Sequence, residues 1–452
     1  MSAGGRVLVV GGGASGALMA AHLLRRPQER IHVTIVERRP EIGRGLAYST
    51  PERDHVLNTR AASMSAFPDE PSHFWDWFQA SGLAREDGCT DAFCFVSRRH
   101  YGRYLDHLLD PYRAGIGDGR LDVVTAECTA LRIGESGVAA ELSDGSLRIA
   151  QAAVLATGHG MAEGAAPARS SSKEDTVLIV GTGLSMIDTV IALLNEGHKG
   201  RIVALSRNGL MPQPHRRNKP LAVDAADIPF GTDISYLTRW FRRTIDWAVA
   251  QGGDWRDVID GIRPHTAAVW ASMPLEARRR FLRHARTFWE IHRHRVPEES
   301  LARIEKARAD GRLEIVAGRI ATMREGPDGT EITYRLRRES AARSLTARRV
   351  VSCTGILRPD ATFRSQLLAG LEARGTIRRD PLGLGLDVAP TNAVLNAAGE
   401  ASRRLFALGP LTAGRFWEVT AVPDIRNQCA ALAGTLAEVI HPDRQLDSLK
   451  RA

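Results

Sequence analysis

Two glycine-rich turns hold the residues with the clearest chemical use. The first, VLVVGGGASG, covers residues 7–16, and the second, VLIVGTGLSM, covers residues 177–186. In each, an apolar run typical of a buried parallel strand leads into a turn that lets the backbone approach a diphosphate, and a helical stretch follows. Two dinucleotide sites in one polypeptide predict two dinucleotides that meet, so that a hydride passes from a nicotinamide to a flavin.

The first turn has the complete GxGxxG spacing. Gly11 permits the tight turn, Gly13 lets the backbone approach a pyrophosphate, and Gly16 lets the following helix pack against the strand. The amides at the start of that helix, Ser15 among them, and the helix dipole would hold the diphosphate. Set between a strand and a helix, this spacing predicts a dinucleotide site.

The end of the second strand differs between the two units, and this difference separates the expected cofactors. In the first unit Glu37, with Arg38 after it, lies about 20 residues beyond the turn, where a carboxylate accepts hydrogen bonds from the ribose of FAD. In the second unit Ser206 and Arg207 occupy this place and suit a 2′-phosphate, which a carboxylate would repel. We therefore expect FAD at the first turn and NADPH, rather than NADH, at the second. The alternative is that Arg207 is a solvated surface arginine.

The second turn departs from the complete pattern at one position. Gly181 and Gly183 are present and Ser185 lies in the following helix, but Met186 stands where the third glycine would be. A larger side chain there moves the helix slightly off the strand. We expect the turn to tolerate this and to bind a dinucleotide.

A further internal repeat indicates that one unit is nested within the other. AAVLATGHG (152–160) and RVVSCTGIL (349–357) each combine an apolar strand with a small-Thr-Gly turn and follow a predicted β-meander. In flavoproteins with two dinucleotides, this turn marks the point where the chain passes between domains. The cofactor-binding residues expected at these turns are Thr157, Gly158 and Gly355.

We therefore expect an α/β fold of two nested Rossmann-like dinucleotide-binding domains. The FAD-binding domain would comprise residues 1–165 and about 320–452, and the NAD(P)-binding domain would comprise residues 166–319. A helical insertion rich in tryptophan and histidine is expected at about 220–310. An addition of this size to a nucleotide domain is where substrate selectivity or a lid would reside.

The C-terminal block is predicted to complete the flavin site. A buried strand ends at Gly409 and Pro410, where this fold brings backbone close to the ribityl chain, and a helix follows from about Val422. If its N-terminus faces the flavin pyrimidine, its amides would stabilise the negative charge of reduced flavin. Trp417 is a candidate catalytic residue on the substrate side; packing beneath the flavin is the alternative.

Composition narrows the remaining classes. Of 452 residues, 43% are hydrophobic, and no stretch suits a membrane span or a signal peptide. The five cysteines are scattered without a CxxC pair, which favours a reducing, cytoplasmic location and argues against disulfides, a metal site or a thiol relay. The net charge of +9 is concentrated in segments without a nucleic-acid motif, so we expect a small-molecule substrate and no nucleic-acid or membrane partner. The oligomeric state stays open.

From end to end, the chain resembles a large bacterial family of FAD/NAD(P)-binding proteins. The blocks that carry this resemblance are GGGASG, GRGLAYST, HVLNTRAASMSAFPDEP, SRRHYGRYL, ATGH, GTGLSMID, DWRDVIDGIRPHT and GRFWEVTAVPDIRNQ. The segment around Asn58, Met64 and Phe67 is also similar, more distantly, to flavin-containing and N-hydroxylating class B monooxygenases. By that resemblance Asn58 would be a catalytic and cofactor-binding residue beside flavin C4a and N5; the alternative is an Asx-turn residue that shapes the loop.

The resemblance implies an FAD-dependent, NADPH-using oxidoreductase. The reaction that it favours is monooxygenation of a small molecule through a C4a-(hydro)peroxyflavin. The alternatives are an NAD(P)H-dependent flavin dehydrogenase or reductase without oxygen insertion, and a low-turnover flavin-binding protein.

Overall fold

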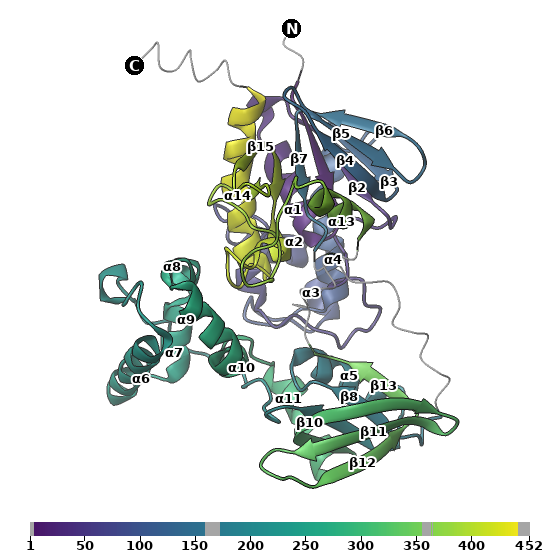
Figure 1. Cartoon of the computed structure of the whole chain (residues 1–452), viewed down its shortest axis with the longest axis vertical. Coiled ribbons are helices and arrows are strands. Elements are labelled where there is room, and N and C mark those ends of the chain that lie inside the picture. The colour runs from purple at the N-terminus through teal and green to yellow at the C-terminus, as the bar shows by residue number, and fades with distance from the viewer. Residues whose placement is uncertain (1–3, 159–171, 355–362, 364, 442–452) are drawn as a thin grey trace. The chain divides into compact units, whose positions relative to one another are not determined.

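The chain folds into two compact units, shown in Figure 1 as a computed structural model that describes residues 4–158, 172–354, 363 and 365–441. Unit 1 comprises Met1–Ala162 and Leu357–Ala452, and unit 2 comprises Glu163–Ile356. Each unit is built on a largely parallel sheet with its own helices. The expected α/β fold with two nested Rossmann-like units is confirmed.

The point at which the chain returns to unit 1 differs from the expectation of about residue 320. The return occurs at residue 357, because the four strands that span residues 313–352 all belong to the sheet of unit 2. The first boundary, at residue 162, lies three residues before the expected 165. Strand pairing between distant segments sets the return point, and local sequence pattern does not report that pairing.

The central sheet of unit 1 has the order β14-β15-β7-β1-β2-β3. Its strands are β1 (Arg6–Val10), β2 (His32–Glu37), β3 (Leu121–Thr125), β7 (Ala152–Leu155), β14 (Ala393–Leu395) and β15 (Ala401–Ala407). β1 pairs in parallel with β2 on one side and with β7 on the other, whereas β14 runs antiparallel to β15. The carboxyl ends of β1, β2, β7 and β15 therefore meet at one edge, where a doubly wound sheet binds its ligand.

Alternate residues of β1 face two different layers. Val7 and Val9 pack in the core formed with α1 (Ala14–Leu24) and α14 (Val422–Ile440), while Leu8 and Val10 face the other side. The first layer also contains α2 (His73–Ala80), α3 (Leu83–Glu86) and α4 (Arg98–His107). The second layer contains β4 (Cys128–Ile133), β5 (Val138–Leu142), β6 (Leu147–Ala150) and α13 (Gln366–Ala373). Burial on both faces explains why β1 is apolar throughout.

Unit 2 repeats this plan with the strand order β12-β11-β10-β9-β8-β13. Its strands are β8 (Val177–Val180), β9 (Ile202–Ser206), β10 (Leu313–Gly326), β11 (Gly329–Leu336), β12 (Ala342–Ala347) and β13 (Arg349–Ser352). β8 pairs in parallel with β9 and with β13, so the strand order reverses at β8 as it does at β1. The helix α5 (Leu184–Asn195) follows β8 and packs in the core on one face of this sheet.

The helical insertion ends earlier than the expected residue 310. α11 (Glu298–Ala309) places Ile304 and Ala307 in the same core as β8 and α5, so this helix belongs to the Rossmann layer. The insertion proper contains α6 (Ile234–Ala250), α7 (Trp255–Gly261), α8 (Thr266–Ser272), α9 (Leu275–Arg280) and α10 (Arg286–Arg293). A π-helical turn at Phe281–Ala285 joins α9 to α10. Within the described ranges, no helix is both long and apolar enough to cross a membrane.

One expectation about the cysteines is wrong. The structure joins Cys89 and Cys94 in a disulfide, whereas the scattered cysteines predicted thiols alone. The intervening loop turns back on itself, with Cys94 N donating to Asp91 O at 3.2 Å, and this brings the two Cα atoms to 5.6 Å. That separation suits a disulfide, and a spacing outside the CxxC pattern does not signal it.

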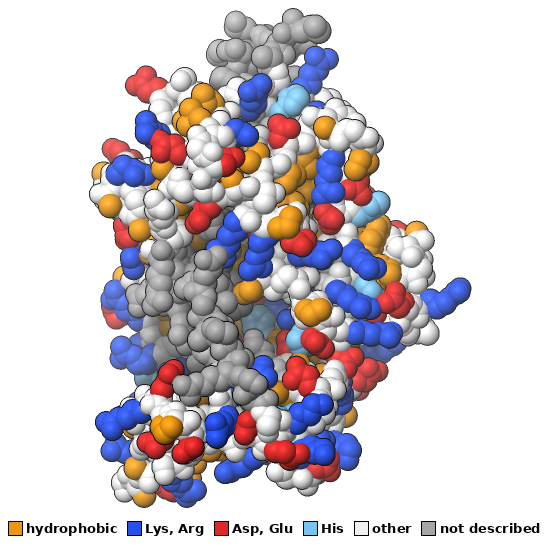
Figure 2. All heavy atoms as spheres, turned by 90° about the vertical axis from the view of Figure 1, so that its right-hand side faces the viewer, with side chains coloured by type: hydrophobic (Ala, Val, Ile, Leu, Met, Phe, Trp, Pro, Cys, Tyr) orange, Lys and Arg blue, Asp and Glu red, His pale blue; other side chains and the backbone are white. Residues whose placement is uncertain are grey.

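Positively and negatively charged side chains are interspersed on the surface that Figure 2 shows. On the face drawn in Figure 2, the Lys and Arg side chains of the described residues lie among Asp and Glu side chains. Arg25 pairs with Asp69 and Glu70, and Arg201 pairs with Glu314. On this face, therefore, the positive charge is spread out and is not gathered in one stripe.

Candidate functional site

The first glycine turn has space for glycine alone at two of its positions. Gly11 has a φ of +104°, and a Cβ built on it would lie 2.6 Å from Ala156 O. A Cβ on Gly16 would lie 1.9 Å from Gly11 O. The turn is held by Gly11 N, which donates to Val36 O at 2.8 Å. This geometry places Gly13 immediately before α1, whose N-terminal amides face the carboxyl edge of the sheet.

A second glycine-rich turn lies against the first. Gly43 N donates to Gly12 O at 2.8 Å, and a Cβ on Gly13 would lie 3.4 Å from the Cα of Gly45. Arg44, between the two glycines, is half-buried, and its Nε is buried without a hydrogen-bond partner among the described residues. An arginine at this place supplies positive charge beside a diphosphate turn. Sequence reasoning did not assign it a role, although the GRG spacing was visible.

Glu37 lies where the adenosine ribose was expected. Its Oε2 accepts from Gly12 N at 2.7 Å and its Oε1 accepts from Arg39 N at 3.1 Å. These bonds orient the carboxylate toward the glycine turn, and each oxygen keeps a lone pair for a hydroxyl donor. Arg38 is exposed.

The turn after β7 presents an unsatisfied hydroxyl. Thr157 Oγ1 is buried and has no hydrogen-bond partner within the described part of the chain, and Gly158 follows with a φ of +68°. A buried hydroxyl is rarely left in this state, so its position next to the Gly11 turn fits a polar ligand. The corresponding Gly355 lies outside the described residues.

The turn after β15 touches the first turn of α1. Gly409 has a φ of +66°, and a Cβ on it would lie 2.5 Å from Ser15 Oγ. Gly409 N donates to Gln428 Oε1 at 2.7 Å, and Gln428 Nε2 donates to Asn392 Oδ1 at 2.6 Å and to Thr412 Oγ1 at 2.9 Å. The buried amide of Gln428 therefore fixes Gly409 and Pro410 against α14. Sequence reasoning missed Gln428, because a glutamine within a helix carries no signal of this contact.

The helix α14 begins at Val422, as expected, with Pro423 in its first turn. Trp417 and Glu418 precede it, and each is 7% exposed. Glu418 has a φ of +71°, an unusual backbone conformation for a residue with a side chain, and such strain concentrates at functional sites. The burial of Trp417 leaves little of its surface for a substrate.

Asn58 lies in unit 1 on a segment that is braced from two sides. Leu57 N donates to Val96 O at 2.8 Å, and Ala61 N donates to Cys94 O at 3.0 Å, so the disulfide loop backs this segment. Arg426 of α14 donates through Nη1 to Ser65 O at 2.7 Å. Asn58 itself is half-buried. The structure thus connects the Asn58 segment to α14, although these segments lie far apart in the sequence.

Unit 2 contains the same turn as unit 1. Gly181 has a φ of +115°, and its Cβ would lie 2.2 Å from Cys353 O. Gly183 and Ser185 are exposed at the start of α5, and a Cβ on Gly183 would meet no atom within 4 Å. Met186 is fully buried in the core beneath the turn. The open space at Gly183 suits the close approach of a nucleotide.

The two residues at the end of β9 have different surroundings. Ser206 Oγ accepts from Gly209 N at 3.0 Å and lies 2.9 Å from Thr182 Oγ1, so its hydroxyl shapes the turn. Arg207 is exposed. Of the two residues predicted to contact a 2′-phosphate, Arg207 therefore presents its side chain to solvent and Ser206 positions the loop that carries it.

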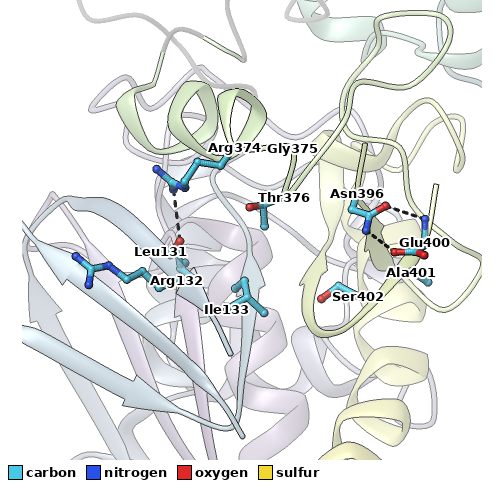
Figure 3. Close-up of a pocket in the computed structure, with 10 residues that line it drawn as sticks. All are labelled: Leu131, Arg132, Ile133, Arg374, Gly375, Thr376, Asn396, Glu400, Ala401 and Ser402. Atoms are coloured by element: carbon cyan, nitrogen blue, oxygen red, sulfur yellow. Dashed lines mark hydrogen bonds between the residues drawn. The ribbon is translucent and has the colours of Figure 1, made fainter. Parts of the chain in front are cut away.

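A separate cavity of about 540 Å³ lies in unit 1 among β4, the end of α13 and the turn between β14 and β15 (Figure 3). It contains Ala401, the first residue of β15, whereas the candidate cofactor site follows the last. Two of its polar residues bond to each other: Asn396 Nδ2 donates to Glu400 Oε2 at 2.9 Å, and Glu400 N donates to Asn396 Oδ1 at 2.9 Å. This cavity is therefore distinct from the cofactor site.

Comparison with known proteins agrees with the expected fold. A family model described as FAD-NAD(P)-binding matches residues 8–160, the part of the chain that contains the first glycine turn, Glu37 and Thr157. No curated protein sequence matches the chain.

Several solved structures share the fold over nearly the whole chain. The ornithine N-hydroxylase of Kutzneria sp. 744 is 16% identical, covers 96% of this chain and 99% of its own, and has a TM-score of 0.63. The ornithine hydroxylase of Pseudomonas aeruginosa is 15% identical, with coverage of 97% and 100% and a TM-score of 0.64. The cadaverine monooxygenase of Erwinia amylovora is 15% identical, with coverage of 96% and 94% and a TM-score of 0.64. The resemblance to N-hydroxylating flavin monooxygenases is confirmed at the level of the fold.

Proposed function

We propose that this protein is an FAD-dependent, NADPH-using monooxygenase of a small molecule. The observation that supports this most is the repetition of one turn in both units, with a carboxylate at the end of the second strand in unit 1 and an exposed arginine there in unit 2. One unit thus suits the ribose of FAD and the other a 2′-phosphate. The likeness of fold to hydroxylases that are named for ornithine and cadaverine further supports a small primary amine as substrate.

Bound FAD would supply the redox chemistry, taking a hydride from NADPH and activating oxygen. The residues of unit 1 fit such a group: Glu37 would accept from the ribose hydroxyls, and Thr157 Oγ1 and Arg44 would contact the diphosphate. The amides at the start of α14 would stabilise negative charge on the flavin ring. Gln428 would act as a positioning residue, because it holds Gly409 near Ser15.

The test is a turnover experiment with isotopically labelled oxygen and a panel of small amines that includes ornithine, lysine and cadaverine. For an amine R–NH₂ the balanced reaction is R–NH₂ + O₂ + NADPH + H⁺ → R–NHOH + NADP⁺ + H₂O. We expect one labelled oxygen atom in the product for each NADPH consumed. Unlabelled product, or hydrogen peroxide equal to the NADPH consumed with every amine, would support the dehydrogenase alternative. Colourless protein that does not take up FAD would overturn the whole proposal.

Asn58 provides a second prediction, about how oxygen chemistry is coupled to substrate. If its amide lies beside the reactive edge of the flavin, Asn58→Ala should retain FAD and its rate of anaerobic reduction by NADPH. The yield of oxygenated product per NADPH should fall several-fold and the yield of hydrogen peroxide should rise. Without a stabilising hydrogen bond, oxygen would be reduced to hydrogen peroxide before it reaches the substrate. Asn396→Ala, in the separate cavity, is the matched control. It should change neither the product yield per NADPH nor the hydrogen peroxide yield per NADPH. If Asn58→Ala loses FAD or reduction instead, Asn58 shapes the loop, as the Asx-turn alternative predicts.

A further inference from the structure

Three segments of unit 2 meet where the helical insertion joins the nucleotide fold: residues 213–218, the helix α7 and residues 291–296. Gln213 N donates to Ile291 O at 2.9 Å, Val296 N donates to Gln213 O at 3.0 Å, and His215 N donates to Val296 O at 2.9 Å. The first segment follows β9 a few residues later in the chain. The bond from Thr182 Oγ1 to Leu210 O, at 2.5 Å, ties the intervening stretch to the nucleotide turn.

Arg256 of α7 holds the junction together and uses all its donor groups to do so. Its Nε and Nη2 donate to Pro214 O at 3.1 and 2.9 Å, and its Nη1 donates to both carboxylate oxygens of Asp254 at 3.1 and 2.9 Å. The guanidinium also lies over the ring of Trp255, at 4.2 Å from the centroid. Arg256 is thus a structural residue with its charge balanced.

Arg295 is equally buried, with 4% of its surface exposed, but its donors are not satisfied. Nη2 donates to Asp260 Oδ1, while Nε and Nη1 are buried and have no hydrogen-bond acceptor among the residues that the structure describes. Asp260 cannot supply a second bond easily, since its Oδ2 accepts from Asn218 Nδ2 at 2.9 Å. Buried polar groups nearly always have a hydrogen-bond partner, so two such nitrogens on one guanidinium call for an acceptor beyond the described residues, such as a ligand.

Arg295 lies in a group of buried charges. Arg256, Arg293 and Arg295 are each at most 9% exposed; Arg256 pairs with Asp254 and Arg295 pairs with Asp260. Although burial opposes ionisation of Asp260, the hydrogen bond and charge of Arg295 hold the pKa of this carboxyl below its usual value. Burial lowers the pKa of Arg256, and the charges of Arg216 and Arg295 lower it further. A buried charge is stable when an opposite charge and hydrogen bonds accompany it.

We propose that Arg295 anchors an oxyanion-binding site at this junction, and that the ligand is a phosphate or carboxylate group of a molecule bound in turnover. The two candidate sources of such a group follow from the proposed function, on which this proposal rests. They are a phosphate of NADPH and the carboxylate of an amino-acid substrate. Guanidinium groups bind both oxyanions through directed, charge-assisted hydrogen bonds. Nothing else in the described junction offers Nε and Nη1 an acceptor.

The first experiment uses inorganic phosphate on the full-length holoprotein at constant ionic strength. A ligand of the folded state raises the unfolding midpoint as its concentration rises, by an amount set by its dissociation constant. We expect phosphate to stabilise the wild type, and Arg295→Gln to weaken phosphate binding at least tenfold. Arg295→Lys should bind phosphate more tightly than Arg295→Gln but less tightly than the wild type. Lysine keeps the positive charge but lacks the planar set of N–H donors of a guanidinium. Arg283→Gln, at an exposed position of the insertion, removes the same charge and should bind phosphate as the wild type does.

The second experiment distinguishes the two sources by ligand pairs. If the anion is a phosphate of NADPH, Arg295→Gln should weaken the binding of NADP⁺. If that phosphate is the 2′-phosphate, the binding of NAD⁺ should be weakened less. If the anion is the substrate carboxylate, the variant should weaken the binding of L-lysine. The binding of cadaverine, which lacks a carboxylate, should not change. Equal phosphate binding by wild type and Arg295→Gln, or the same loss in Arg283→Gln, would overturn the site. Neither result depends on flavin reduction or oxygen insertion, so failure here is separable from failure of the proposed function.

Discussion

Gly181→Ala should yield a protein that retains FAD but is no longer reduced by NADPH. Gly181 has a φ of +115°, and the new Cβ would lie 2.2 Å from the carbonyl oxygen of Cys353. That oxygen cannot move away readily, because Cys353 N donates to Val180 O at 2.7 Å and Gly181 N donates to Leu205 O at 2.8 Å. The left-handed backbone alone costs roughly 1–2 kcal/mol for a residue with a Cβ. Anaerobic mixing with NADPH measures the reduction rate, and denaturation identifies the released flavin.

Two matched variants make this result specific. Gly183→Ala adds a Cβ that meets no protein atom within 4 Å, so any loss of NADPH affinity there comes from crowding of the nucleotide. Gly11→Ala places the equivalent strain in unit 1, where the Cβ would lie 2.6 Å from Ala156 O, and should lose FAD. Dithionite should reduce Gly181→Ala normally. Reduction of Gly181→Ala by NADPH at the wild-type rate would show that the second turn does not bind the nicotinamide cofactor.

The parts of the fold that sequence reasoning predicted are those specified by neighbouring residues. A strand, a turn with glycine at a positive φ and a helix follow one another at 7–24 and again at 177–195. The positive φ at Gly11 and Gly181 is a local requirement for glycine, whereas the carbonyl that would meet a Cβ there follows, in both units, a strand far away in the sequence. The start of α14 at Val422 was likewise signalled by a proline in its first turn.

The parts that were missed depend on contacts between distant residues. Residues 320–352 remain in unit 2 because β10 continues from its pairing with β9 into an antiparallel pairing with β11. The Cys89–Cys94 disulfide depends on how a loop turns, and the Gln428–Asn392–Thr412 network joins three separate segments. The arginines of the insertion include Arg293 of α10, which is buried although its residue type favours the surface. Composition and periodicity do not encode such contacts.

The end of β9 separates two roles that sequence reasoning had combined. Ser206 is held by Gly209 N and Thr182 Oγ1 within the turn, whereas Arg207 extends to solvent beside it. A residue that shapes the loop should affect NADPH and NADH alike. A residue that contacts the 2′-phosphate should affect NADPH alone, because NADH lacks that group.

Arg207→Ala should therefore raise the KM for NADPH about tenfold to a hundredfold, which corresponds to a charge-assisted hydrogen bond of about 1.5–3 kcal/mol. The KM for NADH should change little, so the variant should lose its preference between the two cofactors. Because the arginine is exposed, the effect should shrink as salt is raised. Ser206→Ala is the matched variant and should raise both constants by a similar factor. If Arg207→Ala raises both constants equally, Arg207 does not contact the 2′-phosphate, and the preference for NADPH must then depend on another cation of unit 2.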